Sequence, residues 1–300
     1  IFQGLQAIWS DRELRSKREG RDFFNWFGHW RWLDLFNRGR LEDAGEFYLK
    51  AFAAIGKNEA ARDVFLRALH PKDNQPRALE LFVHFQVNHP DWVSSYPQLA
   101  AAFAIVFDQP FPRTRPHTQV LKSDVPKEPI NLASRFAAFA AAAKARSLEF
   151  DPAKLSVTEL KFVIDHLLPQ SEMEWARQKM SLRRNSFEKA FKSISYDHAR
   201  LAAGVFRWPN GPYTLAAIQA KGGICVDQAY YSAMSGKAKG IPLPDDLMSR
   251  QLHFFNLPRR GDRVLRQAAG PEEGEEVSVF FFFLDRNCWK RTECSIGLRN

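Results

Sequence analysis

One cysteine stands where the chain could support thiol chemistry. Gly222 and Gly223 come shortly before Cys225, and residues 226–239 form a predicted helix that ends at Gly240-Ile241-Pro242. A free thiol has a pKa near 8.5 and is mostly protonated at neutral pH. The first turn of a helix favours the thiolate, because unpaired amides and the helix dipole stabilise negative charge there. Cys225 is therefore a candidate nucleophile, and a structural cysteine in the core is the competing interpretation.

The thirty residues around this cysteine resemble a known motif. Residues 213–242 read YTLAAIQAKGGICVDQAYYSAMSGKAKGIP, which is similar to the core of the transglutaminase-like superfamily, the papain-type cysteine hydrolases. That motif has a glycine before the nucleophilic cysteine, then a helix, then Gly-Ile-Pro. Residues 155–213 resemble, more weakly, the helical lead-in of bacterial transglutaminase-domain proteins. The resemblance implies that Cys225 attacks amide or peptide carbonyls, without a metal or an organic cofactor.

The same resemblance implies where the other catalytic residues belong. In the family a histidine follows on a strand of the sheet, and an aspartate lies on the next strand. The histidine position falls on Ser278 here, and Glu293 stands where the family has aspartate. Serine cannot act as a general base at neutral pH, so the catalytic set is incomplete.

Three interpretations of this gap remain open. The chain can be a degenerate, non-catalytic member of the family, or His253, the only histidine after Cys225, can serve instead. The third is a frame error in the gene over residues 243–279. That segment is charged and rich in Gly and Pro, unlike the residues before it.

Candidates for substrate binding lie close to the cysteine in sequence. In the family, polar or aromatic groups just upstream of the motif can line the oxyanion site, which points to Trp208 and Tyr213. Gly223 allows a substrate to approach the backbone closely, and Gln228 lies on the helix that follows Cys225. For Trp208 and Tyr213, packing in the core is the competing interpretation.

The remaining pattern predicts an α+β protein. Apolar spacing and turn residues indicate a helical scaffold over residues 1–110, and five prolines between 110 and 129 indicate a linker over 111–130. Residues 131–300 are expected to hold a helical lead-in and a transglutaminase-like core with a small antiparallel sheet. Two capping boxes, Ser156–Glu159 and Ser171–Glu174, predict helix starts.

The composition limits the kinds of molecule that the chain is expected to bind. The chain has 45% hydrophobic residues, a net charge of +9 and three cysteines, too few for a disulfide framework. Its basic residues are scattered among acids, which argues against nucleic acid as a partner, and no run of 18 apolar residues exists. The expected partner is a protein or peptide substrate. The sequence starts at Ile1, which suggests a fragment and leaves secretion or a periplasmic location open. The rival to a hydrolase or acyltransferase is a non-catalytic interaction module.

Overall fold

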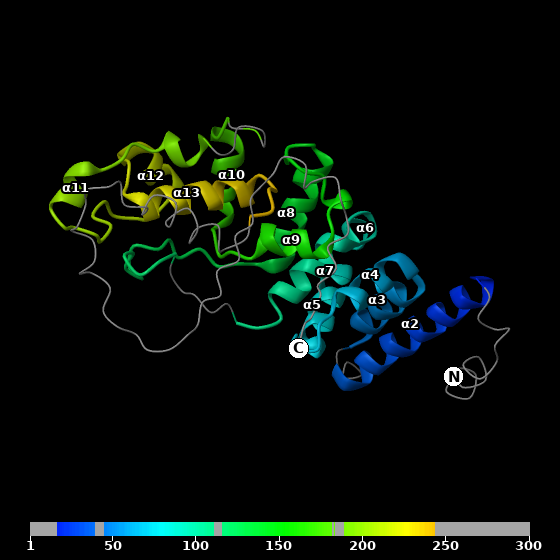
Figure 1. The fold of residues 1–300 in the computed structure, drawn as a ribbon. Helices are drawn as coiled ribbons and strands as arrows, with labels where there is room; N and C mark the ends of the chain where they lie inside the picture. Colours follow the sequence, from blue (N-terminus) through cyan, green and yellow to red (C-terminus); the bar gives the residue numbers. More distant parts are fainter. Residues whose placement is uncertain (1–16, 40–44, 111–115, 182, 184–188, 244–300) are drawn as a thin grey trace, which may run out of the picture. The chain divides into compact units, whose positions relative to one another are not determined.

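The computed structural model describes residues 17–39, 45–110, 116–181, 183 and 189–243. Within these ranges the chain forms helices and loops, and no strand is present (Figure 1). The nearest approach to a sheet in these ranges is a single parallel bridge between Tyr196 and Gly223. The prediction of an α+β fold with a small antiparallel sheet is therefore wrong for the described part, which is helical. The sheet was expected after Gly-Ile-Pro, and those residues lie outside the described ranges.

The first part of the chain is a run of helices joined by short turns, as the apolar spacing predicted. The side chains of Asn58 and Asn74 accept hydrogen bonds from backbone amides three residues later and so cap the helices that follow them. Proline occupies the first turn of the next helices, where no amide donor is required. These helices are α2 (Lys17–Gly39), α3 (Glu46–Lys57), α4 (Glu59–Ala68), α5 (Gln75–Asn88), α6 (Pro90–Ser95) and α7 (Pro97–Val106).

An aromatic core holds these helices together. The rings of Phe65 and Phe82 stack at 4.5 Å, and Phe103 lies edge-on to Phe85 and Phe136. Helix α7 is apolar on all sides, with every residue from Leu99 to Ile105 buried. A helix of that composition is stable only when neighbours cover its whole circumference, and α4, α5, α8 and α9 do so here.

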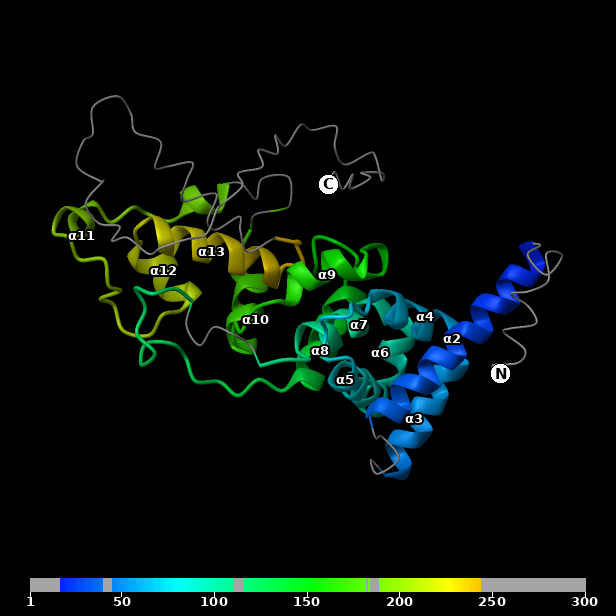
Figure 2. The ribbon, with the colours of Figure 1, turned by 60° about the horizontal axis from the view of Figure 1, so that its bottom comes forward.

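The second half is also helical and ends in α13, which is buried along most of its length. Helices α9, α10 and α12 pack against it (Figure 2). Every residue from Asp227 to Ala238 is buried. The elements are α8 (Leu132–Lys144), η3 (Pro152–Lys154), α9 (Val157–Ile164), α10 (Gln170–Lys179), η5 (Phe191–Ser193), α11 (His198–Ala202), α12 (Leu215–Lys221) and α13 (Cys225–Ala238).

The two predicted capping boxes have different outcomes. Ser156 and Glu159 form both reciprocal hydrogen bonds, so the first box is confirmed. The second prediction is wrong, because α10 already begins at Gln170 and Ser171 lies inside it. The Ser171 hydroxyl instead donates to the carboxylate of Glu128, 2.6 Å away. Ser171 therefore bonds to Glu128, which is 43 residues away in sequence, and not to the nearby Glu174 that the capping box would use.

The described part of the proline-rich segment is packed against the second half of the chain. The carbonyls of Gln119 and Asp124 accept hydrogen bonds from the amides of Trp208 and Tyr213. Val120 is fully buried. This segment thereby supplies groups to the surroundings of α13. Of the helices that the structure describes, none is long and apolar enough to cross a membrane.

Candidate active site at the start of α13

A tight turn between α12 and α13 places Cys225. Gly222 ends α12 with φ of +76°, a conformation that side chains rarely adopt. A Cβ atom on Gly222 would lie 2.5 Å from the carbonyl oxygen of Ser195, and one on Gly223 would collide with Asp227. The Gly223 amide donates to that same Ser195 oxygen, and the Asp197 amide donates to the Gly223 carbonyl. Gly222 thus allows residue 195 to lie against the turn, and Gly223 leaves room for the Asp227 side chain.

Cys225 is the first residue of the 14-residue helix α13, and its thiol is free and half-buried. The Val226 amide and the Tyr196 hydroxyl are polar groups that act favourably on the thiolate of Cys225. Burial raises the pKa of the Cys225 thiol, and the Asp227 carboxylate raises it further. The Val226 amide and the Tyr196 hydroxyl lower this pKa but do not cancel the effect of burial. The resting thiol in this environment is protonated at neutral pH.

Asp227, two residues beyond the cysteine, is the centre of a buried hydrogen-bond network. Its carboxylate accepts from the Ile224 amide at 2.9 Å, from Arg200 Nη1 at 2.6 Å and from the Tyr213 hydroxyl at 3.0 Å. Burial alone would raise the pKa of this carboxyl, but His117 and Arg200 hold it below its usual value. Asp227 is therefore ionised, and it fixes the start of α13 by capping the amide that precedes Cys225.

A histidine from the proline-rich segment completes this network. His117 Nε2 lies 2.9 Å from the Tyr213 hydroxyl and 3.7 Å from an Asp227 oxygen. Because the tyrosine donates its proton to Asp227, its oxygen accepts from His117 Nε2–H. The other ring nitrogen, Nδ1, accepts from the Gln119 amide. The hydrogen bonds thus define which nitrogen carries the proton.

The four predicted substrate-binding residues, Trp208, Tyr213, Gly223 and Gln228, lie around the hydrogen-bond network of Asp227. Trp208 and Tyr213 are each 2% exposed, and their rings meet edge to face. Trp208 donates to the Gly211 carbonyl, and Gln228 donates to the Ile194 carbonyl at 2.7 Å. Together with Gly223 these residues hold the chain around Cys225 in place. Their contact with a substrate stays a prediction.

Two predicted catalytic residues, His253 and Glu293, lie outside the described residues. Among those described, no imidazole hydrogen-bonds the Cys225 thiol; the nearest link is His198, whose ring lies 4.9 Å from that of Tyr196. In the same part of the chain, no group of three His, Cys, Asp or Glu side chains is arranged to hold a metal ion.

Sequence reasoning missed the residues that surround the cysteine most closely. Asp227 and Tyr196 were part of the motif and its lead-in, but neither was assigned a role. The carboxylate at the third position of a helix was a usable signal for a cap. His117 and Arg200 had no such signal, because their partners lie 96 and 27 residues away.

Comparison with known proteins identified no relative of this chain. No family model matches the chain, and neither a curated protein nor a solved structure is similar to it.

Proposed function

We propose that Cys225 is the nucleophile of a reaction at an amide or peptide bond, either hydrolysis or acyl transfer. The observation that carries this proposal is the position of Cys225 at the first residue of the 14-residue helix α13, directly after a glycine turn, with its thiol half-buried. The Val226 amide and the Tyr196 hydroxyl lower the pKa of the thiol, although burial raises it more. The resemblance of residues 213–242 to the transglutaminase-like superfamily supports the same role.

The reaction proceeds in two steps. The Cys225 thiolate attacks the carbonyl carbon, a C–S bond forms and electrons move onto the oxygen, where amides at the helix start stabilise them. The C–N bond then breaks, and the amine leaves with a proton from a general acid. Water or a second amine attacks the thioester, releases the acyl group and returns the sulfur to its starting state.

This scheme requires an imidazole that takes the thiol proton and later gives it to the leaving amine. His117 hydrogen-bonds to the Tyr213 hydroxyl and not to the thiol, so it does not fill this role. We assign the role of general base to His253, the only histidine after Cys225 in the sequence.

The test is a thiol-reactivity profile on the full chain. Cys288 and Cys294 are replaced by serine, so that Cys225 is the single thiol. Iodoacetamide alkylation and acetyl transfer from p-nitrophenyl acetate are followed by intact mass across pH, with Cys225→Ser as the control. The described surroundings alone raise the pKa of Cys225, so they would place the alkylation midpoint above the value of about 8.5 for a free cysteine. With His253 acting as the base, we expect a midpoint below that value and a transient acetyl-protein. A midpoint above that value, with no acetyl-protein, contradicts the proposal.

One observation favours the second candidate, a non-catalytic interaction module. The described surroundings raise the pKa of Cys225 instead of lowering it. A module of this kind uses the helix start only as structure. It predicts that Cys225→Ser leaves partner binding and stability nearly unchanged.

A further inference from the structure

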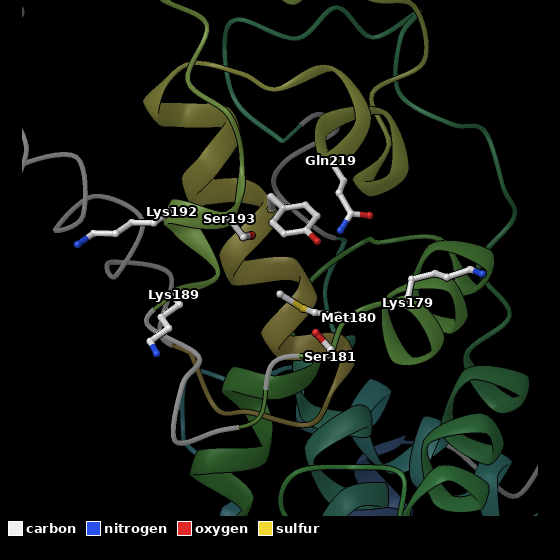
Figure 3. A pocket seen from close by; sticks show the side chains of 8 residues that line it. Lys179, Met180, Ser181, Lys189, Lys192, Ser193 and Gln219 are labelled. Atoms are coloured by element: carbon white, nitrogen blue, oxygen red, sulfur yellow. The ribbon is translucent and has the colours of Figure 1, made fainter.

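A pocket of about 560 Å³ opens beside the middle of α13. Its floor consists of Met180 and Tyr231, which are buried. Its walls carry the exposed polar side chains of Ser181, Ser193 and Gln219, which come from three different segments. Figure 3 shows the Gln219 amide and the Ser193 hydroxyl near the opening. A volume of this size is typical of a ligand site, in which apolar surface is combined with a few polar groups.

Positive charge surrounds the pocket. Lys179, Lys189 and Lys192 line it, and no acidic residue does among the residues that the structure describes. Within the described chain none of these lysines forms an ion pair with a carboxylate. Figure 3 shows Lys179 and Lys192 on opposite sides of the pocket, with their ammonium groups pointing outward, on long side chains that can turn toward a ligand. The pocket therefore offers positive charge that no described side chain neutralises.

The pocket lies on the same elements as the candidate nucleophile. Tyr231 follows Cys225 by six residues on α13, a rise of about 9 Å along the helix axis. On the opposite wall, Ser193 is three residues before Tyr196, whose hydroxyl contacts the thiol. The intervening Ile194 carbonyl accepts from Gln228 and so holds this wall against α13. The pocket and the candidate nucleophile therefore share two segments, α13 and residues 193–196.

We propose that this pocket binds an acidic peptide segment of the substrate, through side-chain carboxylates that pair with the three lysines. The inference rests on the proposed function, because an amide-directed thiol requires a peptide-like ligand nearby. Ser193 and Gln219 supply hydrogen-bonding groups for a peptide backbone. Nucleic acid fits less well, because it requires a continuous basic stripe, and the basic residues of this chain are scattered.

The experiment measures binding without turnover. A fluorescent glutamate-rich peptide and its glutamine counterpart are titrated by anisotropy against the full chain carrying Cys225→Ser. We expect the glutamate peptide to bind at least about tenfold more tightly, and added salt to reduce the difference. The combined change Lys179→Ala, Lys189→Ala and Lys192→Ala is expected to remove the preference. These side chains are exposed, so circular dichroism should be unchanged.

A matched control removes the same charge elsewhere. The exposed Lys57, Lys72 and Lys122 lie outside the pocket lining, and their combined replacement by alanine should keep the preference. Equal binding of the two peptides, loss of preference in the control, or stronger competition by single-stranded DNA overturns the proposal. Acetyl transfer to Cys225 is scored separately. Peptide binding without it refutes the proposed chemistry alone, and acetyl transfer without a glutamate preference refutes the pocket alone.

Discussion

Replacement of Arg200 by methionine should destabilise the protein more than any surface charge change. Arg200 Nη1 lies 2.6 Å from Asp227, and the two side chains are 3% and 0% exposed. Methionine keeps much of the aliphatic stem but leaves the carboxylate buried without its cationic partner. Breaking such a pair from one side costs about 3–5 kcal/mol. The carbonyls of Val205 and Phe206 also lose a donor, but these residues are almost half exposed, so water can replace it.

The assay is urea unfolding of the full chain, followed by circular dichroism. With a denaturant slope of about 2 kcal/mol per M, the expected loss lowers the midpoint by about 1.5–2.5 M. Arg38→Met is the matched control, because Arg38 pairs with Asp34 at a similar 2.7 Å but with side chains 53% and 38% exposed. It should cost no more than about 1 kcal/mol.

A second substitution tests the electrostatic cause. Adding Asp227→Asn to Arg200→Met removes the unpaired buried charge and should recover part of the lost stability. If the two changes are additive, or if Arg200→Met costs no more than Arg38→Met, the buried pair does not support the start of α13 and the reasoning is refuted.

The other predictions concern the turn, a buried histidine and the thiol itself. Gly222→Ala should cost clearly more than Gly204→Ala, by about 1–3 kcal/mol in urea unfolding, because both have positive φ but only the Cβ at 222 meets backbone; equal costs would contradict this. Burial beside Arg135, Lys237 and Arg177 lowers the pKa of His166 well below its usual value, so the unfolded chain binds a proton that the folded chain does not. Stability should therefore fall as pH drops below about 6.5, by up to about 1.4 kcal/mol per pH unit, and His166→Asn should flatten that dependence; an unchanged slope would exclude His166 as its source. Tyr196→Phe removes a hydrogen bond that lowers the pKa of Cys225, so alkylation at pH 7.5 should slow by about 2- to 10-fold, and an unchanged rate would show that the contact does not act on the thiol.

Local signals in the sequence were sufficient for the helices. The predicted cap Ser156, and the caps Asn58 and Asn74, which were predicted only as turn residues, each accept from an amide three residues away. The position of Cys225 at a helix start followed from Gly222 and Gly223 shortly before it. These interactions span one helical turn, so the sequence alone contains both partners at a known spacing.

In the described part of the chain, the expectation of a sheet failed for a related reason. It came from the resemblance of the segment around Cys225, not from alternation in the described residues themselves. The described chain has apolar residues at helical spacing, and between Tyr196 and Gly223 it forms one bridge without extending it into a ladder. The single bridge holds residue 196 against the glycine turn. Helices α9, α10 and α12 pack against α13 in place of a sheet.

The sequence by itself determined the helical segments, the glycine turn and the cysteine at its end, because each depends on residues within a few positions of one another. Only the tertiary structure decided what surrounds the cysteine. His117, Arg200 and Tyr213 come together on Asp227 because packing of distant segments leaves one buried carboxylate that must be paired. The spacing of residues in the sequence does not predict this contact, because the contact depends on how whole helices and loops pack against one another.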